Sequence, residues 1–248
     1  MTQFGAFIIG DEILSGKRQD KHFVQVIQTL KTRGLELSWC EYLGDDPQRI
    51  TAALQRTFAA ADVVFSFGGI GATPDDYTRQ CAARAAGVEL YRHPDALAEI
   101  VAQFGDGAYP KRVLMADLPR GSRIIPNPYN RVPGFSFNQH HFLPGFPEMA
   151  WPMLEWVLAT HYAHLKNEIS EQAIAVLGAR ESLLLDLMNE CVARFPQLKL
   201  FSLPHLADKN YQIELGVRGN VMQVPEAMQF LKQGVSALGF KWEEPRSG

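Results

Sequence analysis

The stretch "DVVFSFGGIGATPDDYT", residues 62–78, runs from an apolar segment through a glycine-rich turn into two adjacent carboxylates. The apolar part, residues 62–69, is short and bounded on both sides, which is typical of a buried strand. In the turn, Gly68, Gly69 and Gly71 accept positive φ angles and have no Cβ, so backbone N–H groups can converge on a ligand. The stretch therefore predicts a strand followed by an anion-binding loop.

The segments before this stretch predict further strands and helices in alternation. Two apolar runs, "FGAFIIG" (4–10) and "LELSWCEYLG" (35–44), are typical of strands. Between and after them, apolar residues recur at helical spacing behind the N-cap candidates Asp20 and Asp46, the second of which is followed by Pro47. Short connections between such elements favour a parallel sheet covered on both faces, so we expect a three-layer α/β sandwich.

A second domain is indicated by a change of pattern near residue 165. After residue 87 the chain is punctuated by Pro and Gly, and helical spacing returns from Pro147 to about Tyr162. Beyond a polar stretch the order becomes strand, helix (180–195), strand, strand, helix (224–238). We therefore predict an α/β domain over 1–165 and a small α+β domain over 166–248.

The composition limits which classes of partner the protein is expected to bind. Lys and Arg number 24 against 27 Asp and Glu, a net charge of −3, which argues against broad nucleic-acid binding. The three cysteines form no CxxC pair, so neither a disulfide framework nor a zinc knuckle is indicated. No stretch approaches the roughly 20 apolar residues of a membrane span, and no basic leader precedes the first apolar run. We expect a cytoplasmic protein that binds neither membranes nor nucleic acid.

The carboxylates of "TPDD" (73–76) allow two interpretations. In the first, Thr73 is an N-cap, Pro74 is the first helical residue, and Asp76 completes a capping box. In the second, Asp75 and Asp76 hold a divalent cation, which would offset their repulsion of a bound phosphate. A carboxylate fixed at a helix start can serve in both ways, so the interpretations do not exclude one another for Asp76.

Two other turns are expected near this loop. "GDEILSG" (10–16) follows the first strand at the same edge of a parallel sheet, so Asp11 and Glu12 either converge on the loop or form a solvated turn. "LPGFPE" (143–148) is a rigid bend that leads into a helix. His140 and His141 are adjacent on a predicted strand, where their side chains point to opposite faces and cannot hold one metal ion.

Taken in order, "GDEILSG", "GGIGATPDDYT", "PNPYNRVPGF" and "LPGFPEM" resemble the molybdopterin-binding fold of the MogA/MoaB/MoeA superfamily, and most closely the amino-terminal part of CinA proteins. The tail, 168–248, is similar to the small middle module of CinA. No counterpart of the carboxyl-terminal nicotinamide-nucleotide amidase domain of many CinA proteins is expected, so deamidation is not carried over.

The resemblance implies roles for particular residues. Asp76 matches the acid of the family's metal and phosphate chemistry, Asp75 the adjacent acid in CinA members, and Glu12 a metal-binding acid of the first turn. The remaining ligand-binding positions are Gly68, Gly69, Gly71, Thr73, Pro144, Gly145 and Pro147. This chain has Ala72 where CinA commonly has proline, and Arg131 is a guanidinium near the predicted mouth that suits a phosphate fork.

The implied ligand is a small molecule that carries phosphate, either molybdopterin or an adenine dinucleotide, with Mg²⁺ or another divalent cation as cofactor. The implied activities are molybdopterin adenylylation and metal-dependent hydrolysis of a pyrophosphate such as ADP-ribose or FAD. The alternatives are a non-catalytic carrier of the same ligands and a protein-interaction module. Relatives of this fold self-associate, so a homo-oligomer is expected.

Overall fold

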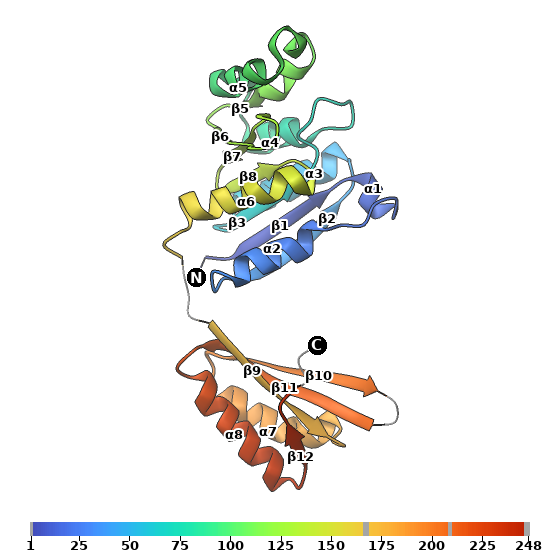
Figure 1. Ribbon diagram of the computed structural model, residues 1–248, viewed down its shortest axis with the longest axis vertical. Helices are drawn as coiled ribbons and strands as arrows, with labels where there is room; N and C mark the ends of the chain where they lie inside the picture. The colour runs from blue at the N-terminus through green and yellow to red at the C-terminus, as the bar shows by residue number, and fades with distance from the viewer. Residues whose placement is uncertain (1, 166–168, 208–209, 246–248) are drawn as a thin grey trace. The chain divides into compact units, whose positions relative to one another are not determined.

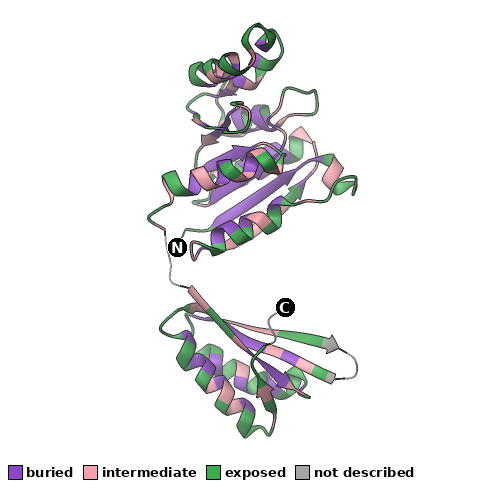
Figure 2. Cartoon of the chain, in the orientation of Figure 1, coloured by how far each residue is buried: buried purple, intermediate pink, exposed green. Residues whose placement is uncertain are grey.

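The computed structural model describes residues 2–165, 169–207 and 210–245, and the chain divides into two compact units, Met1–Leu165 and Lys166–Gly248 (Figure 1). Each unit has its own hydrophobic core, and in Figure 2 the buried residues of each lie between its sheet and its helices. No helix among the described residues is both long and apolar enough to cross a membrane.

The first unit is built on a six-stranded sheet. The strands, in spatial order, are β2 (Leu37–Leu43), β1 (Phe4–Ile9), β3 (Val63–Phe67), β8 (His140–Leu143), β7 (Gly134–Phe137) and β6 (Arg123–Ile125). The first four are parallel, whereas β7 and β6 are antiparallel to their neighbours. Between β7 and β8, Asn138 and Gln139 both have positive φ, as a two-residue hairpin requires. The predicted mostly parallel sheet is confirmed.

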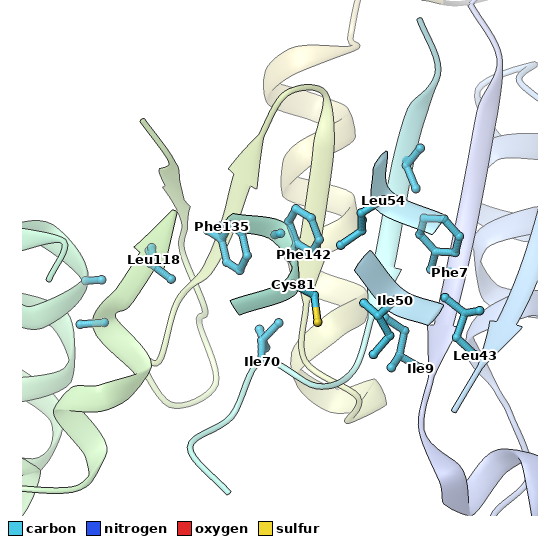
Figure 3. Packing of buried hydrophobic residues seen from close by; sticks show 14 of the residues in the cluster. Phe7, Ile9, Leu43, Ile50, Leu54, Ile70, Cys81, Leu118, Phe135 and Phe142 are labelled. Carbon is cyan, nitrogen blue, oxygen red and sulfur yellow. The ribbon is translucent and has the colours of Figure 1, made fainter. Parts of the chain in front are cut away.

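Helices cover both faces of this sheet. On one face lie α2 (His22–Lys31) and α6 (Pro147–His161), which pack on Phe65 and Phe67. On the other lie α3 (Pro47–Phe58) and α4 (Thr78–Ala86), and Figure 3 shows residues of their shared core. The alternating side chains of each strand thus enter two separate cores, which confirms the three-layer sandwich.

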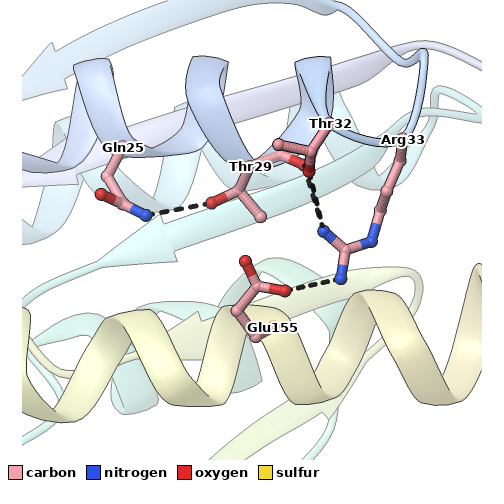
Figure 4. Close-up of polar contacts among 5 residues, drawn as sticks. All are labelled: Gln25, Thr29, Thr32, Arg33 and Glu155. Carbon is pink, nitrogen blue, oxygen red and sulfur yellow. Dashed lines mark hydrogen bonds and ion pairs between the residues drawn. The ribbon is translucent and has the colours of Figure 1, made fainter.

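An ion pair joins the two helices of one face. Arg33 follows α2, and its Nη2 lies 2.5 Å from Glu155 Oε2 on α6 (Figure 4). Arg33 also donates to the carbonyl of Thr29, at 3.2 Å, within α2. The guanidinium therefore anchors the carboxyl end of α2 to α6.

A smaller substructure follows α4. It contains a two-stranded antiparallel sheet of β4 (Leu90–Arg92) and β5 (Asp117–Pro119). Between these strands lie α5 (Pro94–Phe104) and two short 3-10 helices, η1 (Gly105–Ala108) and η2 (Arg112–Ala116). This is the segment whose Pro and Gly punctuation gave no regular pattern in the sequence.

The second unit is a four-stranded antiparallel sheet with order β10-β11-β9-β12 and two helices packed on it. Its elements are β9 (Ile169–Leu177), α7 (Glu181–Arg194), β10 (Lys199–Ala207), β11 (Asn210–Asn220), α8 (Val224–Ala237) and β12 (Lys241–Glu243). This βαββαβ order is a split βαβ motif. The predicted α+β fold is confirmed, and β12 was not anticipated.

Candidate functional site

The glycine loop crosses the carboxyl edge of the parallel strands between β1 and β8. Gly68 has φ 102°, and a Cβ there would lie 2.2 Å from the carbonyl oxygen of Ile9 at the end of β1. Gly69 has φ 67°, and its Cβ would lie 2.3 Å from Thr78 Oγ1. Because both positions combine a left-handed backbone with a close neighbour, only glycine fits them.

The helix after this loop begins later than one interpretation of the sequence placed it. Helix α4 starts at Thr78, not at Pro74. Thr78 is fully buried, its hydroxyl donates to the carbonyl of Gly68 at 3.1 Å, and its N–H donates to the carbonyl of Gly69 at 3.0 Å. These bonds draw the first turn of α4 back onto the glycines, so the predicted capping box at the helix start is wrong.

Residues 73–76 form a turn of their own instead. The N–H of Asp76 donates to the carbonyl of Thr73 at 3.0 Å, and the Asp76 carboxylate accepts from the Thr73 N–H at 2.8 Å and from the Thr73 hydroxyl. A Cβ on Gly71 would lie 2.4 Å from Asp76 Oδ2. Asp76 therefore packs against the glycine loop while it closes the turn, and Thr73 is its direct partner.

Acidic side chains from the ends of β1 and β2 meet at the same edge. The N–H of Asp11 donates to Asp45 Oδ2 at 2.9 Å, and the N–H of Asp45 donates to Asp11 Oδ1 at 3.1 Å. Burial raises the pKa of Asp45, and so do the charges of Asp11, Glu12 and Asp75, while the bond from Asp11 N–H opposes them. Asp75 itself is exposed, and its hydrogen bond with Thr73 lowers its pKa.

The turn after β1 thus contacts the turn after β2, and the convergence of Asp11 and Glu12 on the glycine loop stays a prediction. Asp45 was missed by the sequence analysis, which used "GDDP" (44–47) only for the N-cap Asp46. That N-cap is confirmed, because Asp46 accepts from Gln48 N–H at 2.8 Å. The usable signal was position: Asp45 directly follows a parallel strand, at the edge where the other acids lie.

The acids at this edge suit a metal ion held jointly by protein and substrate better than one held by the protein alone. Among the described residues, no group of three or more His, Cys, Asp or Glu side chains is placed to hold a metal ion. Among the same residues, no contact joins Glu12 to Asp76, the two side chains expected to hold one metal ion together. Mg²⁺ in phosphate sites commonly takes one or two carboxylates, and the substrate's phosphates and water complete its shell. One or two carboxylates of this edge would fit that arrangement.

A pocket of about 400 Å³ opens beside the loop, on the face covered by α2 and α6. Its lining includes Glu12, Gly145 and Pro147 from the predicted site, but not Pro144 or the residues of the glycine loop beyond Phe67. The other lining residues are Ile8, Ile9, Ile13, Arg18, Gln19, Asp20, Lys21, His22, Phe67, Phe146 and Glu148. A Cβ on Gly145 would lie 3.5 Å from the Cα of Gly68, so the predicted bend contacts the glycine loop.

His22 holds this bend in place and was not anticipated. Its Nε2 donates to the carbonyl of Gly145 at 3.1 Å, and its ring stacks on Phe67 with centroids 4.5 Å apart. Burial lowers the pKa of His22, although the bond to Gly145 and the charges of Asp20 and Glu148 oppose this. The neutral ring therefore carries its proton on Nε2, which leaves Nδ1 as a buried acceptor without a partner.

Three other candidates have structural partners elsewhere. Arg131 pairs through its Nε with Glu99 Oε2 on α5, at 2.9 Å, and its role as a phosphate fork stays a prediction. His140 contacts Thr57 Oγ1 at 2.8 Å, whereas His141 contacts the Tyr162 hydroxyl at 2.8 Å. Thr57 lies on α3 and Tyr162 follows α6, so the two rings face opposite sides of the sheet, as predicted.

Comparison with known proteins agrees with this fold. A family model described as a probable molybdopterin binding domain matches residues 5–164. A CinA-like protein of Anaeromyxobacter dehalogenans is 35% identical over 181 residues, which are 70% of this chain and 44% of that protein. Another, of Citrifermentans bemidjiense, is 32% identical over 243 residues, which are 94% of this chain and 58% of that protein.

Among solved structures, the CinA protein of Thermoplasma acidophilum, described as of unknown function, matches with a TM-score of 0.58 and 28% identity. The match covers 64% of this chain and 98% of that one. The chain spans about half the length of the curated relatives it matches, 44% and 58%. The family match extends over most of the first unit and includes each motif at the carboxyl edge, and the chain belongs to the molybdopterin-binding domain family.

Proposed function

We propose that this protein binds a small molecule that carries phosphate or pyrophosphate, a pterin such as molybdopterin or an adenine dinucleotide, at the carboxyl edge of its parallel sheet. The observation that carries the proposal is the backbone of Gly68 and Gly69, which is left-handed and lies where no side chain fits. The N–H of Gly68 already donates to the carbonyl of Leu143 at 3.0 Å, so the N–H groups that follow it in the loop are the ones proposed to face the anion, and the helix start at Thr78 adds a favourable dipole. The phosphate lies against this loop.

The pocket beside the loop takes the ring part of the ligand. Its apolar wall includes Ile8, Phe67 and Phe146, and the rest of its lining is polar or charged: Glu12, Arg18, Gln19, Asp20, Lys21, His22 and Glu148. Small-molecule sites combine apolar surface that encloses a ring with polar groups that orient it. Because the Gly145 bend contacts Gly68, the glycine loop and the pocket adjoin. One ligand could therefore place its phosphate on the loop and its ring in the pocket.

We further propose metal-dependent hydrolysis of a dinucleotide pyrophosphate of the ADP-ribose or FAD type. A divalent cation, held by Glu12 and a neighbouring acid together with the phosphates, would polarise the phosphoryl group. Asp45 has a raised pKa and lies among the acids of this edge, which suits it to accept a proton from the attacking water. Asp76 keeps the loop in shape through Thr73, so in this scheme it positions the phosphate.

A non-catalytic carrier of the same ligands is the second candidate. The observation in its favour is that the Asp76 carboxylate already accepts two hydrogen bonds from Thr73 and closes a turn. A carboxylate with this structural role needs no catalytic one. A carrier would bind its ligand stoichiometrically and release no product.

The test is an AMP-release assay with ADP-ribose and FAD, each with and without Mg²⁺, Mn²⁺ or Co²⁺. Hydrolysis predicts metal-dependent AMP that falls at least about a hundredfold in Asp45→Asn, the effect typical of a lost general base. Asp186→Asn, an exposed acid of α7 in the second unit, is the matched control and should keep full activity.

Three outcomes separate the candidates. AMP formation that requires metal and Asp45 supports the pyrophosphatase. Stoichiometric binding of ADP-ribose or molybdopterin without turnover, under every metal condition, supports the carrier. Failure to bind any of these ligands contradicts both and favours the protein-interaction alternative.

A further inference from the structure

Arg79 is a buried arginine directly below the glycine loop. It lies in the first turn of α4, and only 4% of its surface is exposed. Its Nη2 donates to the carbonyl of Gly71 at 2.5 Å, and its Nη1 donates to the carbonyls of Leu114 at 2.5 Å and Asp117 at 3.1 Å. One guanidinium thus ties the loop to η2 and to the start of β5.

No carboxylate bonds directly to Arg79, although the charges of Asp117 and Asp76 lie close enough to favour its charged form. Asp117 uses both carboxylate oxygens for Arg92, at 2.5 and 3.1 Å, and Asp76 is bonded to Thr73. No ion pair joins Arg79 to any acid in the described part of the chain, and its buried Nε has no hydrogen-bond partner. A buried charge is costly unless it is paired, so this arrangement calls for an explanation.

We propose that Arg79 is a positioning residue of the phosphate-binding loop, whose buried positive charge is balanced by the anionic part of the ligand. The inference rests on the proposed function and explains why the proposed site would select anionic ligands. The bond to Gly71 fixes the loop before the ligand arrives, which lowers the cost of ordering it on binding. The positive charge, in a region of low dielectric, favours a phosphate over an uncharged ligand.

The residue is not explained by packing alone. A methionine of similar length would fill the same space without the cost of burying a guanidinium. Three carbonyl oxygens do satisfy part of its hydrogen-bonding capacity, yet carbonyls carry only partial charge and leave the net charge in place. A bound anion at the adjacent loop would add its negative charge to those of Asp117 and Asp76, neither of which bonds to the guanidinium.

The experiment is a calorimetric titration of pyrophosphate, and separately of ADP-ribose, into the wild-type chain and three variants. Arg79→Met removes the charge and is expected to weaken binding at least about tenfold, the effect of losing one close favourable charge. Arg79→Lys keeps the charge without the fork and is expected to bind within about threefold of wild type. Arg56→Met is the matched control, because Arg56 lies in the same unit, is paired with Glu41 and is not among the charges that act on Arg79.

The outcomes are distinguishable. If wild type binds and Arg79→Met binds equally well, the role of Arg79 is overturned while the proposed function stands. If wild type binds neither pyrophosphate nor ADP-ribose, this inference fails together with the dinucleotide form of the proposed function, and a molybdopterin titration decides the pterin form. Should Arg79→Met not fold, the lysine variant decides: a folded Arg79→Lys that loses binding entirely would refute the charge role, and retained binding would support it.

Discussion

Replacing Gly68 by alanine tests whether the glycine loop is shaped by its contact with β1. The backbone at Gly68 has φ 102°, and the added Cβ would lie 2.2 Å from the carbonyl oxygen of Ile9. The left-handed backbone alone costs a non-glycine residue roughly 1–2 kcal/mol. Relief of the clash requires a shift of buried backbone, and overpacking of this kind typically costs about 1–3 kcal/mol more.

Gly87→Ala provides a matched control. Gly87 ends α4 with φ 67°, and a Cβ there meets nothing within 4 Å, so it incurs the backbone cost without the clash. We expect Gly68→Ala to lower the free energy of unfolding by roughly 2–5 kcal/mol, against about 1–2 kcal/mol for Gly87→Ala.

The assay is urea denaturation followed by tryptophan fluorescence. Of the four tryptophans only Trp242 lies in the second unit, so a Trp242→Phe background makes the signal report the first unit. The two units need not unfold together, which is why a local signal is required. Equal losses for the two glycine variants, within about 0.5 kcal/mol, would refute the claim that contact with β1 shapes the loop.

Three further results are expected. Burial lowers the pKa of His140 to about 4 and of His141 to about 3, below the ordinary 6.5. The unfolded chain therefore binds more protons in this range, and the free energy of unfolding decreases as the pH is lowered from about 6.5 to 4. The slope, up to roughly 1.4 kcal/mol per pH unit for each histidine, is measured by denaturation across that range and should shrink in His140→Gln; an unchanged slope would contradict it. Glu155→Gln should cost less than about 1 kcal/mol, because its pair with Arg33 is half-exposed, and a larger loss in urea denaturation would mean that the pair is stronger than surface pairs usually are. Burial raises the pKa of Cys40 to about 11, so its alkylation at pH 8 should be about a hundredfold slower than that of a free thiol, and rapid labelling would show that the thiol is accessible.

The regular part of the fold could be predicted because its signals are local. Short apolar runs that end at Gly10 and Gly68 marked buried strands, and apolar residues at helical spacing marked the covering helices. The alternation of the two then fixes a parallel layer order by known rules of connection. The small strand β12 gave no such signal, since three residues are too few for a period to show.

The details of the site depended on tertiary contacts that no local pattern encodes. Helix α4 begins at Thr78 and not at the expected Pro74, because Thr78 donates hydrogen bonds to the carbonyls of Gly68 and Gly69, ten and nine residues earlier. Arg131 lies beside Glu99 of α5, which is 32 residues away in the sequence. Arg79 gave no sign in the sequence that it would be buried.

The most direct test of the central claim is hydrogen–deuterium exchange of the full chain with and without saturating ADP-ribose, and likewise with molybdopterin. If phosphate lies against the glycine loop and the ring lies in the pocket, ligand should slow exchange in two segments together, residues 68–73 and 145–150. Binding that leaves both segments unprotected, or protects only the second unit, would contradict the account.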